Sequence, residues 1–243
     1  MSHRFFIPPN WITPPTVTLQ GDVARQLRTV LRMQPGHTII VLDNSGREWQ
    51  VKLTEIGKST AQGEIVSEEQ VESEPKLHLT LYQGTLKAQK FEWVLQKGTE
   101  LGVSGFVPLI CQRSVVRDSA ALTKKEERWQ RIIREAAEQA GRGKLPHLEP
   151  ALPFDQAMRH AYATPLRVML WEEALAPGLK TALVKTNRIA LFVGPEGGFT
   201  AEEAATAQQM SFKVVKLGPR ILRAETAGLA ATAAIMYELG EWE

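Results

Sequence analysis

The chain has little of several things that mark particular protein classes. Among its 243 residues there is a single cysteine, Cys111, so no disulfide can form within the chain. No apolar run is long enough to cross a membrane, and the first nine residues lack the long apolar segment of a signal peptide. We therefore expect a cytoplasmic protein with no membrane partner.

An excess of one charge sign is also missing. The chain has 29 basic and 27 acidic residues, a net charge of +2, which is not the profile of a strongly basic nucleic-acid coat. If the protein binds RNA, its basic residues must gather on one face. The five histidines show no paired metal-ligand spacing, so we predict no structural metal.

The N-terminal third of the chain is mostly of strand type. Residues 38–42, 48–53 and 63–66 are short strand-like segments, which predict a small β-barrel. One helix, from Asp22 to about Arg32, interrupts them. An acidic, polar stretch that ends at Pro75 has the composition of a linker. We therefore predict one domain over residues 1–73 and a second over residues 74–243.

Three arginines lie along the predicted helix of the first domain. Arg25, Arg28 and Arg32 are three and four residues apart, so on a regular α-helix they share a face. Contact with RNA phosphates is one interpretation of this stripe. The alternative is an ordinary solvated face.

The second domain alternates strands with helices. Strands are predicted at 77–82, 105–110, 168–171, 189–193 and 214–217, and helices at 90–101, 123–139 and 225–239, which is the pattern of a parallel α/β sheet. Thr123 with Glu126, and Thr200 with Glu203, have the spacing of capping boxes that open helices.

Two glycine-rich loops follow two of these strands. The first is the stretch GPEGG from Gly194 to Gly198, and the second is LGPRILRAETA, residues 217–227. Glycine permits positive φ angles and lets the backbone approach a ligand closely. We expect the two loops to lie side by side at the carboxyl ends of neighbouring strands, the edge where open α/β sheets bind ligands. A plain strand-to-helix turn is the alternative for either loop alone.

The same motifs carry a family resemblance. The segments FVGPEGGFTAEE and LGPRILRAETAGLAATAA resemble the last two motifs of the RsmE family, and the likeness continues in KFEWVLQKGTELGVSGFVPLICQRSVV, RWQRIIREAAEQAGR and LRTVLRMQPGHTIIVLD. Members of that family methylate N3 of a uridine in 16S ribosomal RNA and belong to the SPOUT superfamily. The likeness covers most of the chain.

The resemblance implies a fold, a cofactor and partners. It implies a SPOUT domain with a C-terminal trefoil knot, preceded by a PUA-like barrel that helps to hold RNA. The implied cofactor is S-adenosylmethionine, the implied substrate is 16S ribosomal RNA within the small subunit, and the implied assembly is a homodimer through the final helix. The positions implied to bind the cofactor are Leu170, Gly194, Glu196, Gly197, Gly198, Leu217, Gly218, Ile221 and Leu222.

Methylation of uridine N3 requires loss of a proton from a weak acid, so a base or a positive partner is needed. Arg223 and Glu225, both in the second loop, are the candidate catalytic residues, Arg223 for charge stabilisation and Glu225 as a base. The alternatives are that the two pair with each other or that Glu225 helps to start the last helix. Arg142, beside glycines, is a candidate phosphate ligand, and its alternative is an ordinary exposed arginine.

Two other functions stay open at this point. One is a SPOUT enzyme that acts on another RNA position, such as a ribose 2′-hydroxyl. The other is an RNA-binding module without catalysis. Cys111 ends an apolar strand and is interpreted as a core residue, which weakens a C5-methylation mechanism that needs a reactive cysteine.

Overall fold

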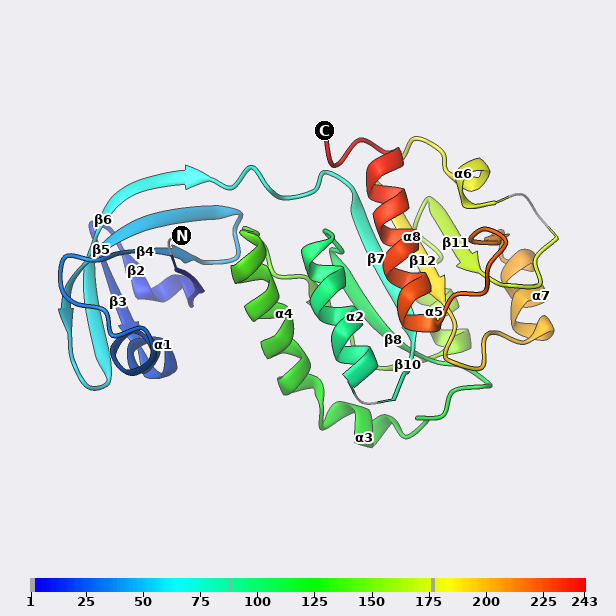
Figure 1. The fold of residues 1–243 in the computed structure, drawn as a ribbon, viewed down its shortest axis with the longest axis horizontal. Helices are drawn as coiled ribbons and strands as arrows, with labels where there is room; N and C mark the ends of the chain where they lie inside the picture. The colour runs from blue at the N-terminus through cyan, green and yellow to red at the C-terminus, as the bar shows by residue number, and fades with distance from the viewer. Residues whose placement is uncertain (1–2, 88, 176–177) are drawn as a thin grey trace. The chain divides into compact units, whose positions relative to one another are not determined.

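The computed structural model describes residues 3–87, 89–175 and 178–243. By its internal contacts the chain divides into two compact units. The first comprises the residues up to Glu74 together with Ala137–Leu145, and the second comprises Pro75–Ala136 and Pro146–Glu243. Figure 1 shows the ribbon of the described residues. Each unit has its own apolar core.

The N-terminal unit is built on a six-stranded sheet. Its strands are β1 (Arg4–Phe6), β2 (Ile12–Thr13), β3 (Thr16–Gln20), β4 (Thr38–Leu42), β5 (Arg47–Ile56) and β6 (Thr60–Gln70). They pair in the order β1-β4-β5-β6-β3-β2, antiparallel except for β1 with β4. The three predicted strands are present. Among the described residues the edge strands β1 and β2 do not pair, so the sheet is not a closed hydrogen-bonded barrel.

The predicted helix of this unit is shorter and less regular than expected. A short α-helix, α1 (Gly21–Arg25), continues into a π-helical turn, η2 (Gln26–Val30). Arg32 lies beyond this turn with a φ of 51°, a left-handed conformation that ends helical structure. Ala24 and Leu27 on its inner face are buried against the sheet's core.

A segment from the middle of the chain also belongs to the N-terminal unit. It contains the end of α4 (Glu126–Ala140), which was predicted to end at about residue 139 and ends just before Gly141, where φ is +74°. Ala137 packs with Phe6, Leu42 and Val71 in a small buried cluster.

The C-terminal unit is built on a parallel sheet. Its strands are β7 (His78–Gly84), β8 (Gly105–Ile110), β9 (His147–Leu148), β10 (Leu152–Pro153), β11 (Leu166–Leu170), β12 (Arg188–Val193) and β13 (Lys213–Val215). The order is β10-β8-β7-β12-β11-β13, with β9 also on β8, and every pairing is parallel. The predicted parallel α/β sheet is confirmed. The strands β7, β8, β11 and β12 are mostly buried on both faces, which explains their continuous apolar sequences.

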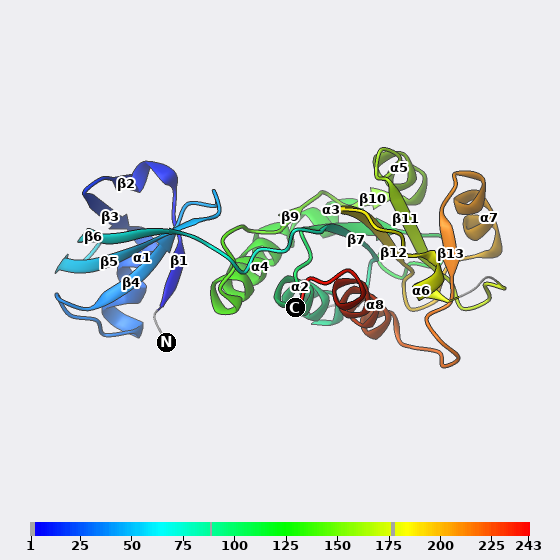
Figure 2. The same cartoon turned by 90° about the horizontal axis from the view of Figure 1, so that it is seen from above.

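Helices cover both faces of this sheet. The remaining helices are α2 (Gln89–Glu100), α3 (Ser119–Thr123), α5 (Phe154–His160), α6 (Leu179–Ala182), α7 (Ala201–Gln209) and α8 (Ala224–Glu238). Figure 2 shows α2 and α8 on one face and α5 and α7 on the other, and two separate apolar clusters fill these faces. None of the helices among the described residues combines the length and the apolar character needed to span a membrane.

The two predicted capping boxes have different outcomes. At Thr200 the box is present: its hydroxyl accepts from Glu203 N, and the Glu203 carboxylate accepts from Thr200 N. At Thr123 the prediction is wrong, because Thr123 is the last residue of α3 and its hydroxyl donates to the Ser119 carbonyl. The cap in this region is Asp118, whose side chain accepts from Ala120 N.

Candidate active site

The two glycine loops open from one edge of the parallel sheet but not from adjacent strands. The strand β11 lies between β12 and β13, so the expectation of neighbouring strands was wrong. Parallel strands end at the same edge, and two strand spacings separate the loops by roughly 10 Å. This wider separation leaves room for a cavity of about 770 Å³ between them, with Leu170 at the end of β11 in its wall.

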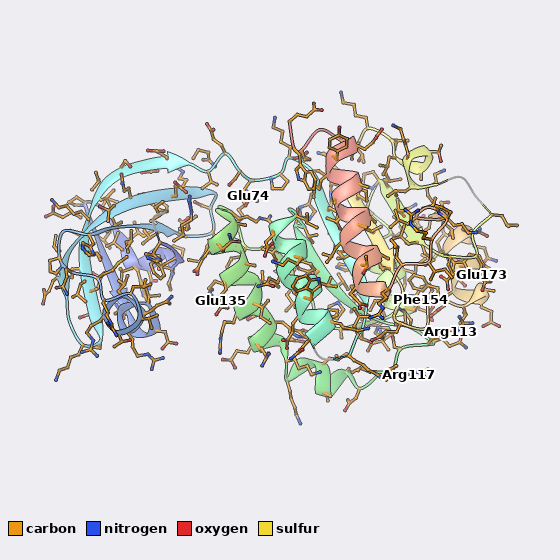
Figure 3. The ribbon with its side chains drawn as sticks, in the orientation of Figure 1. Glu74, Arg113, Arg117, Glu135, Phe154 and Glu173 are labelled. Carbon is orange, nitrogen blue, oxygen red and sulfur yellow. The ribbon has the colours of Figure 1, made fainter. Side chains whose placement is uncertain are left out.

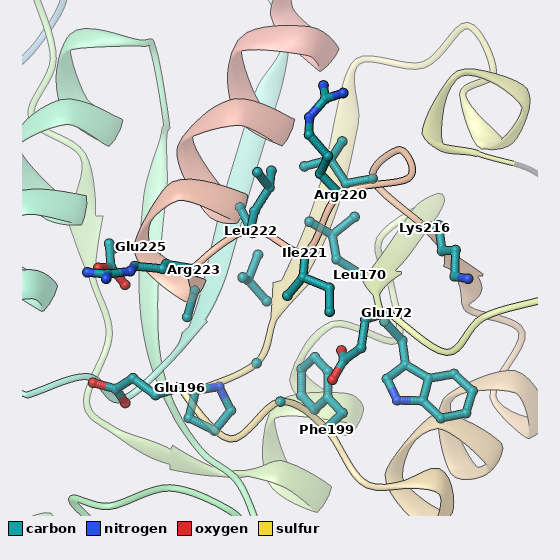
Figure 4. Close-up of a pocket in the computed structure, with 18 of the residues that line it drawn as sticks. Leu170, Glu172, Glu196, Phe199, Lys216, Arg220, Ile221, Leu222, Arg223 and Glu225 are labelled. Carbon is teal, nitrogen blue, oxygen red and sulfur yellow. The ribbon is translucent and has the colours of Figure 1, made fainter.

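Most of the predicted cofactor positions line this cavity, as Figure 4 shows for those it labels. They are Leu170, Gly194, Glu196, Gly198, Leu217, Gly218, Ile221 and Leu222. The ninth, Gly197, turns away from it. Its carbonyl accepts from Arg113 Nη1 at 3.1 Å, and a Cβ at Gly197 would lie 2.9 Å from Arg113 Cβ. Gly197 therefore supports the loop instead of lining the cavity.

Glycine is needed in the first loop because the loop is tightly folded. Gly198 has a φ of +69°, and a Cβ there would lie 2.7 Å from Glu172 Oε1. A Cβ at Gly194 would lie 3.1 Å from the backbone of Gly198. At Gly218 in the second loop φ is +76° and a Cβ would meet nothing within 4 Å. Substitution at Gly194 would therefore move the loop, whereas Gly218 faces open space.

The first loop is also held by the loop after β8, through contacts that sequence reasoning missed. The carboxylate of Glu203 accepts from Gln112 N and from Thr200 N, both at 2.9 Å, and so joins the loop after β8 to the loop after β12. Arg113, labelled in Figure 3, belongs to the same loop after β8. The capping box between Thr200 and Glu203 was predicted, but no role was predicted for the CQRSVV segment, which contains Gln112 and Arg113 and was noted only for its likeness to the family.

Several charged side chains lie at one end of the cavity. Arg223 and Glu225 lie together there, with Glu196 nearby (Figure 4). Arg223 is exposed, does not cap α8 with its side chain, and has no ion pair among the described residues. Glu225 pairs instead with Lys90, whose Nζ lies 3.2 Å from Glu225 Oε1. The expected alternative of an Arg223–Glu225 pair is thus replaced by a partner that the sequence did not suggest.

The carboxylate of Glu225 is largely enclosed. Its side chain is 15% exposed, and Oε2 is buried with no hydrogen-bond partner among the described residues. Lys90 engages Oε1, whereas Oε2 has an unused acceptor position but is enclosed by the protein. The opposite part of the cavity carries Glu172 and Lys216, which Figure 4 shows well apart from Arg223.

The predicted RNA-binding arginines have different surroundings. Arg25 and Arg28 are exposed on the short helix of the N-terminal unit, and Arg25 forms an exposed ion pair with Asp22 at 2.8 Å. Arg32 is exposed as well, but it lies past the helical segment. The three therefore do not form a stripe on one regular helix.

The fourth RNA-binding candidate, Arg142, was predicted wrongly. It is 4% exposed, and its guanidinium Nε and Nη2 donate to the Glu74 carboxylate at 3.2 and 3.1 Å. Gly143 N and Lys144 N donate to the same carboxylate. A buried guanidinium held in this way cannot reach a phosphate, so Arg142 has a structural role.

Cys111 is buried, as its core interpretation required. Burial, and secondarily the negative charge of Glu203, raise the pKa of the Cys111 thiol well above its usual range. A neutral, enclosed thiol is a poor nucleophile. In the part of the chain that the structure describes, no group of three or more His, Cys, Asp or Glu side chains is placed to hold a metal ion.

Comparison with known proteins decides the family. The family described as RNA methyltransferase domain matches residues 72–236, and the RNA methyltransferase PUA domain matches residues 19–66. The chain is 33% identical to ribosomal RNA small subunit methyltransferase E of Bacillus subtilis, over 92% of this chain and 91% of that one. It is 38% identical to the protein of the same name from Synechocystis, over 97% and 77% of the two chains. The chain belongs to the ribosomal RNA small subunit methyltransferase E family.

Solved structures of similar proteins agree with this assignment. A ribosomal RNA small subunit methyltransferase E from Neisseria gonorrhoeae, bound to S-adenosyl methionine, is 34% identical with a TM-score of 0.89, and 98% of each chain is covered. A putative methyltransferase from Legionella pneumophila, in complex with bound SAM, is 31% identical with a TM-score of 0.90 over the same shares. The family predicted from the motifs is confirmed, and with it the PUA-like character of the N-terminal unit.

Proposed function

We propose that this protein transfers a methyl group from S-adenosylmethionine to N3 of a uridine in 16S ribosomal RNA. The observation that carries the proposal is the cavity between the two glycine loops, in a chain of the methyltransferase E family. Two relatives more than 30% identical to this chain are described as bound to the same cofactor.

The cavity suits this cofactor in size and chemistry. Its volume of about 770 Å³ lies in the range of small-molecule sites. The apolar side chains of Leu170, Leu217 and Leu222 offer a surface for an adenine ring, and the acidic Glu172 offers a partner for positive charge. We propose that the cofactor positions named above hold it through the two loops. When bound, the cofactor supplies a methyl group activated by a positively charged sulfur.

The protein must help with the proton on N3. Uracil N3 attacks well only as its anion, whose charge spreads onto the flanking carbonyl oxygens. Arg223, exposed at the cavity and without an ion pair among the described residues, is available to stabilise that charge. A base role for Glu225 has less support, because Lys90 engages one of its oxygens and the other is buried. We therefore assign electrostatic stabilisation of the uracil anion to Arg223, and a supporting role other than that of the base to Glu225.

We assign RNA binding to the domain predicted over residues 1–73, and methyl transfer to the domain predicted over residues 74–243. Arg25, Arg28 and Arg32 are exposed on the first of these. Replacing all three with alanine should weaken RNA binding and reduce its salt dependence, because phosphate contacts release counterions. Cofactor affinity should be unchanged. An unaltered salt slope would return the three arginines to the solvated-face interpretation.

The knot, the oligomeric state and the cellular location are also proposals. A C-terminal trefoil knot is in keeping with the position of β12, which enters the sheet between β7 and the earlier strand β11. A homodimer is supported by the exposed side chains of Val184 and Tyr237, which share one depression with Leu239 near the end of α8. Tyr237→Glu should then lower the mass measured by light scattering towards that of one chain. We propose a cytoplasmic location because the proposed substrate is ribosomal RNA.

One experiment tests the reaction directly. Small ribosomal subunits from a strain that lacks this enzyme are incubated with the protein and labelled cofactor, and the labelled nucleoside is identified by mass spectrometry. The expected product is 3-methyluridine. A 2′-O-methyl nucleoside would instead establish the ribose as target, and cofactor binding without transfer would indicate a non-catalytic module.

A further inference from the structure

Lys90 brings a second positive charge to the end of the cavity where Arg223 lies. It is the second residue of α2 and lines the cavity, although α2 is far from the second glycine loop in sequence. Its Nζ lies 3.2 Å from Glu225 Oε1, at the start of α8, and α2 packs against α8. The ion pair therefore holds the ammonium group at this end of the cavity. Since the ammonium group has three N–H donors and Glu225 takes one, others are available to a ligand.

Two cations at one end of a cavity suit one feature of uracil. N3 lies between the C2 and C4 carbonyl groups, so loss of its proton places negative charge on both oxygens. A cation at each oxygen stabilises the anion more than a single cation does. Cytosine carries an amino group at C4, which is a donor and would face one of the cations without a matching acceptor. The arrangement therefore favours uracil over cytosine.

We propose that Lys90 is the second cation of the acceptor subsite, that Lys90 and Arg223 each hold one uracil carbonyl oxygen, and that Glu225 positions Lys90. The proposal rests on the uridine-N3 function proposed above. In the step it describes, the N3–H proton passes to water and the N3 electron pair forms the bond to the methyl carbon. The electron pair of the broken carbon–sulfur bond stays on sulfur.

Nearby carboxylates make placement more important than net charge. Glu196 also lines this cavity, and its Oε1 accepts from Lys87 N at 3.1 Å. Glu196 and Glu225 offset part of the positive charge of Lys90 and Arg223. We therefore expect stabilisation to come from direct contacts of the two cations with the oxygens.

Lys90→Met tests the proposal because methionine keeps the length and apolar character of the side chain but removes its charge. Single-turnover methylation is measured with saturating cofactor on RNA that carries either uridine or 5-fluorouridine at the target. The N3 proton of 5-fluorouridine is more acidic, so its anion needs less stabilisation. With uridine we expect a loss on the order of a hundredfold, the effect of removing one charge-stabilising donor. With 5-fluorouridine most of that loss should disappear.

The control lies on the same helix. Lys97 forms an ion pair with Glu100 at 2.7 Å and does not line the cavity, so Lys97→Met should keep normal turnover on both substrates. Lys90→Arg retains the charge and should retain most activity. If Lys90→Met alone fails to fold, Lys90→Met combined with Glu225→Gln removes both charges of the pair and is measured in its place.

Particular outcomes would overturn the assignment of Lys90. Normal uridine turnover in Lys90→Met would do so, and so would an equal loss on both substrates, which indicates a structural role only. Failure of the parent enzyme to form 3-methyluridine would instead refute the proposed function, so the two failures are distinguishable. Cofactor affinity, measured by calorimetry, should be the same in the parent and in Lys90→Met.

Discussion

Replacing Glu74 with alanine should destabilise the N-terminal unit, and this test separates a structural role for Arg142 from an RNA-binding one. The Glu74 carboxylate accepts from Arg142 Nε and Nη2 at 3.2 and 3.1 Å. It also accepts from Gly143 N at 2.9 Å and Lys144 N at 3.0 Å. One side chain therefore ties the end of the strand-rich segment to the turn that follows α4.

The size of the effect follows from burial. The Arg142 side chain is 5% exposed and that of Glu74 is 19% exposed. Removing one partner of a buried ion pair typically costs about 3–5 kcal/mol. Because water reaches part of Glu74, the lower end of that range applies, and we expect the free energy of unfolding to fall by about 3 kcal/mol.

The assay is urea unfolding of the full chain, monitored with a spectroscopic probe that reports on the N-terminal unit. Glu72, two residues earlier and exposed, provides the matched control, and Glu72→Ala should change stability by less than about 0.5 kcal/mol. RNA affinity is measured against salt for Arg142→Met. Reduced stability with an unchanged salt slope is expected. A stable Arg142→Met variant with a flatter salt slope would refute the structural role and restore the phosphate contact.

Further predictions concern the catalytic unit. Arg223→Ala should lower kcat by a factor on the order of a hundred in single-turnover methylation with little change in cofactor affinity, and normal turnover would contradict its electrostatic role. Gly198→Ala and Gly240→Ala both place a side chain at a left-handed φ, which should lower the free energy of unfolding by about 1 kcal/mol in each variant. Calorimetry should show weaker cofactor binding only for Gly198→Ala, because only there would the new Cβ meet Glu172. Because burial raises its pKa, Cys111 should react with iodoacetamide at pH 8 far more slowly in the native protein than in urea, and equal rates would disprove its enclosure.

Much of the C-terminal fold was predictable because its strands are short apolar runs bounded by turn residues. The segment 105–110 was predicted as a strand and is β8, and 189–193 falls within β12 (Arg188–Val193). The strands β9 and β10 have two residues each and carry no periodic signal. The spatial order of the strands was also hidden, because periodicity identifies strands without saying which of them pair.

The site was predictable where it depends on local backbone and not where it depends on tertiary contacts. The glycine loops were found because positive φ angles demand glycine at Gly198 and Gly218. Arg142 was predicted wrongly because flanking glycines suggest exposure, whereas Glu74, 68 residues away, buries it. Lys90 was missed because its partner lies on α8, and no local pattern links the two helices.

The approach of α8 to the sheet shows why small residues matter to this site. Alanine favours helix formation, but that preference does not explain Gly228, because glycine within a helix costs about 1 kcal/mol relative to alanine. A Cβ at Gly228 would lie 2.7 Å from Gln83 Oε1, on strand β7. Glycine therefore lets α8 lie close to the end of β7. Glu225 is one helical turn earlier on α8. The distance between α8 and the sheet therefore sets the position of Glu225, and through the ion pair with Glu225 the position of Lys90.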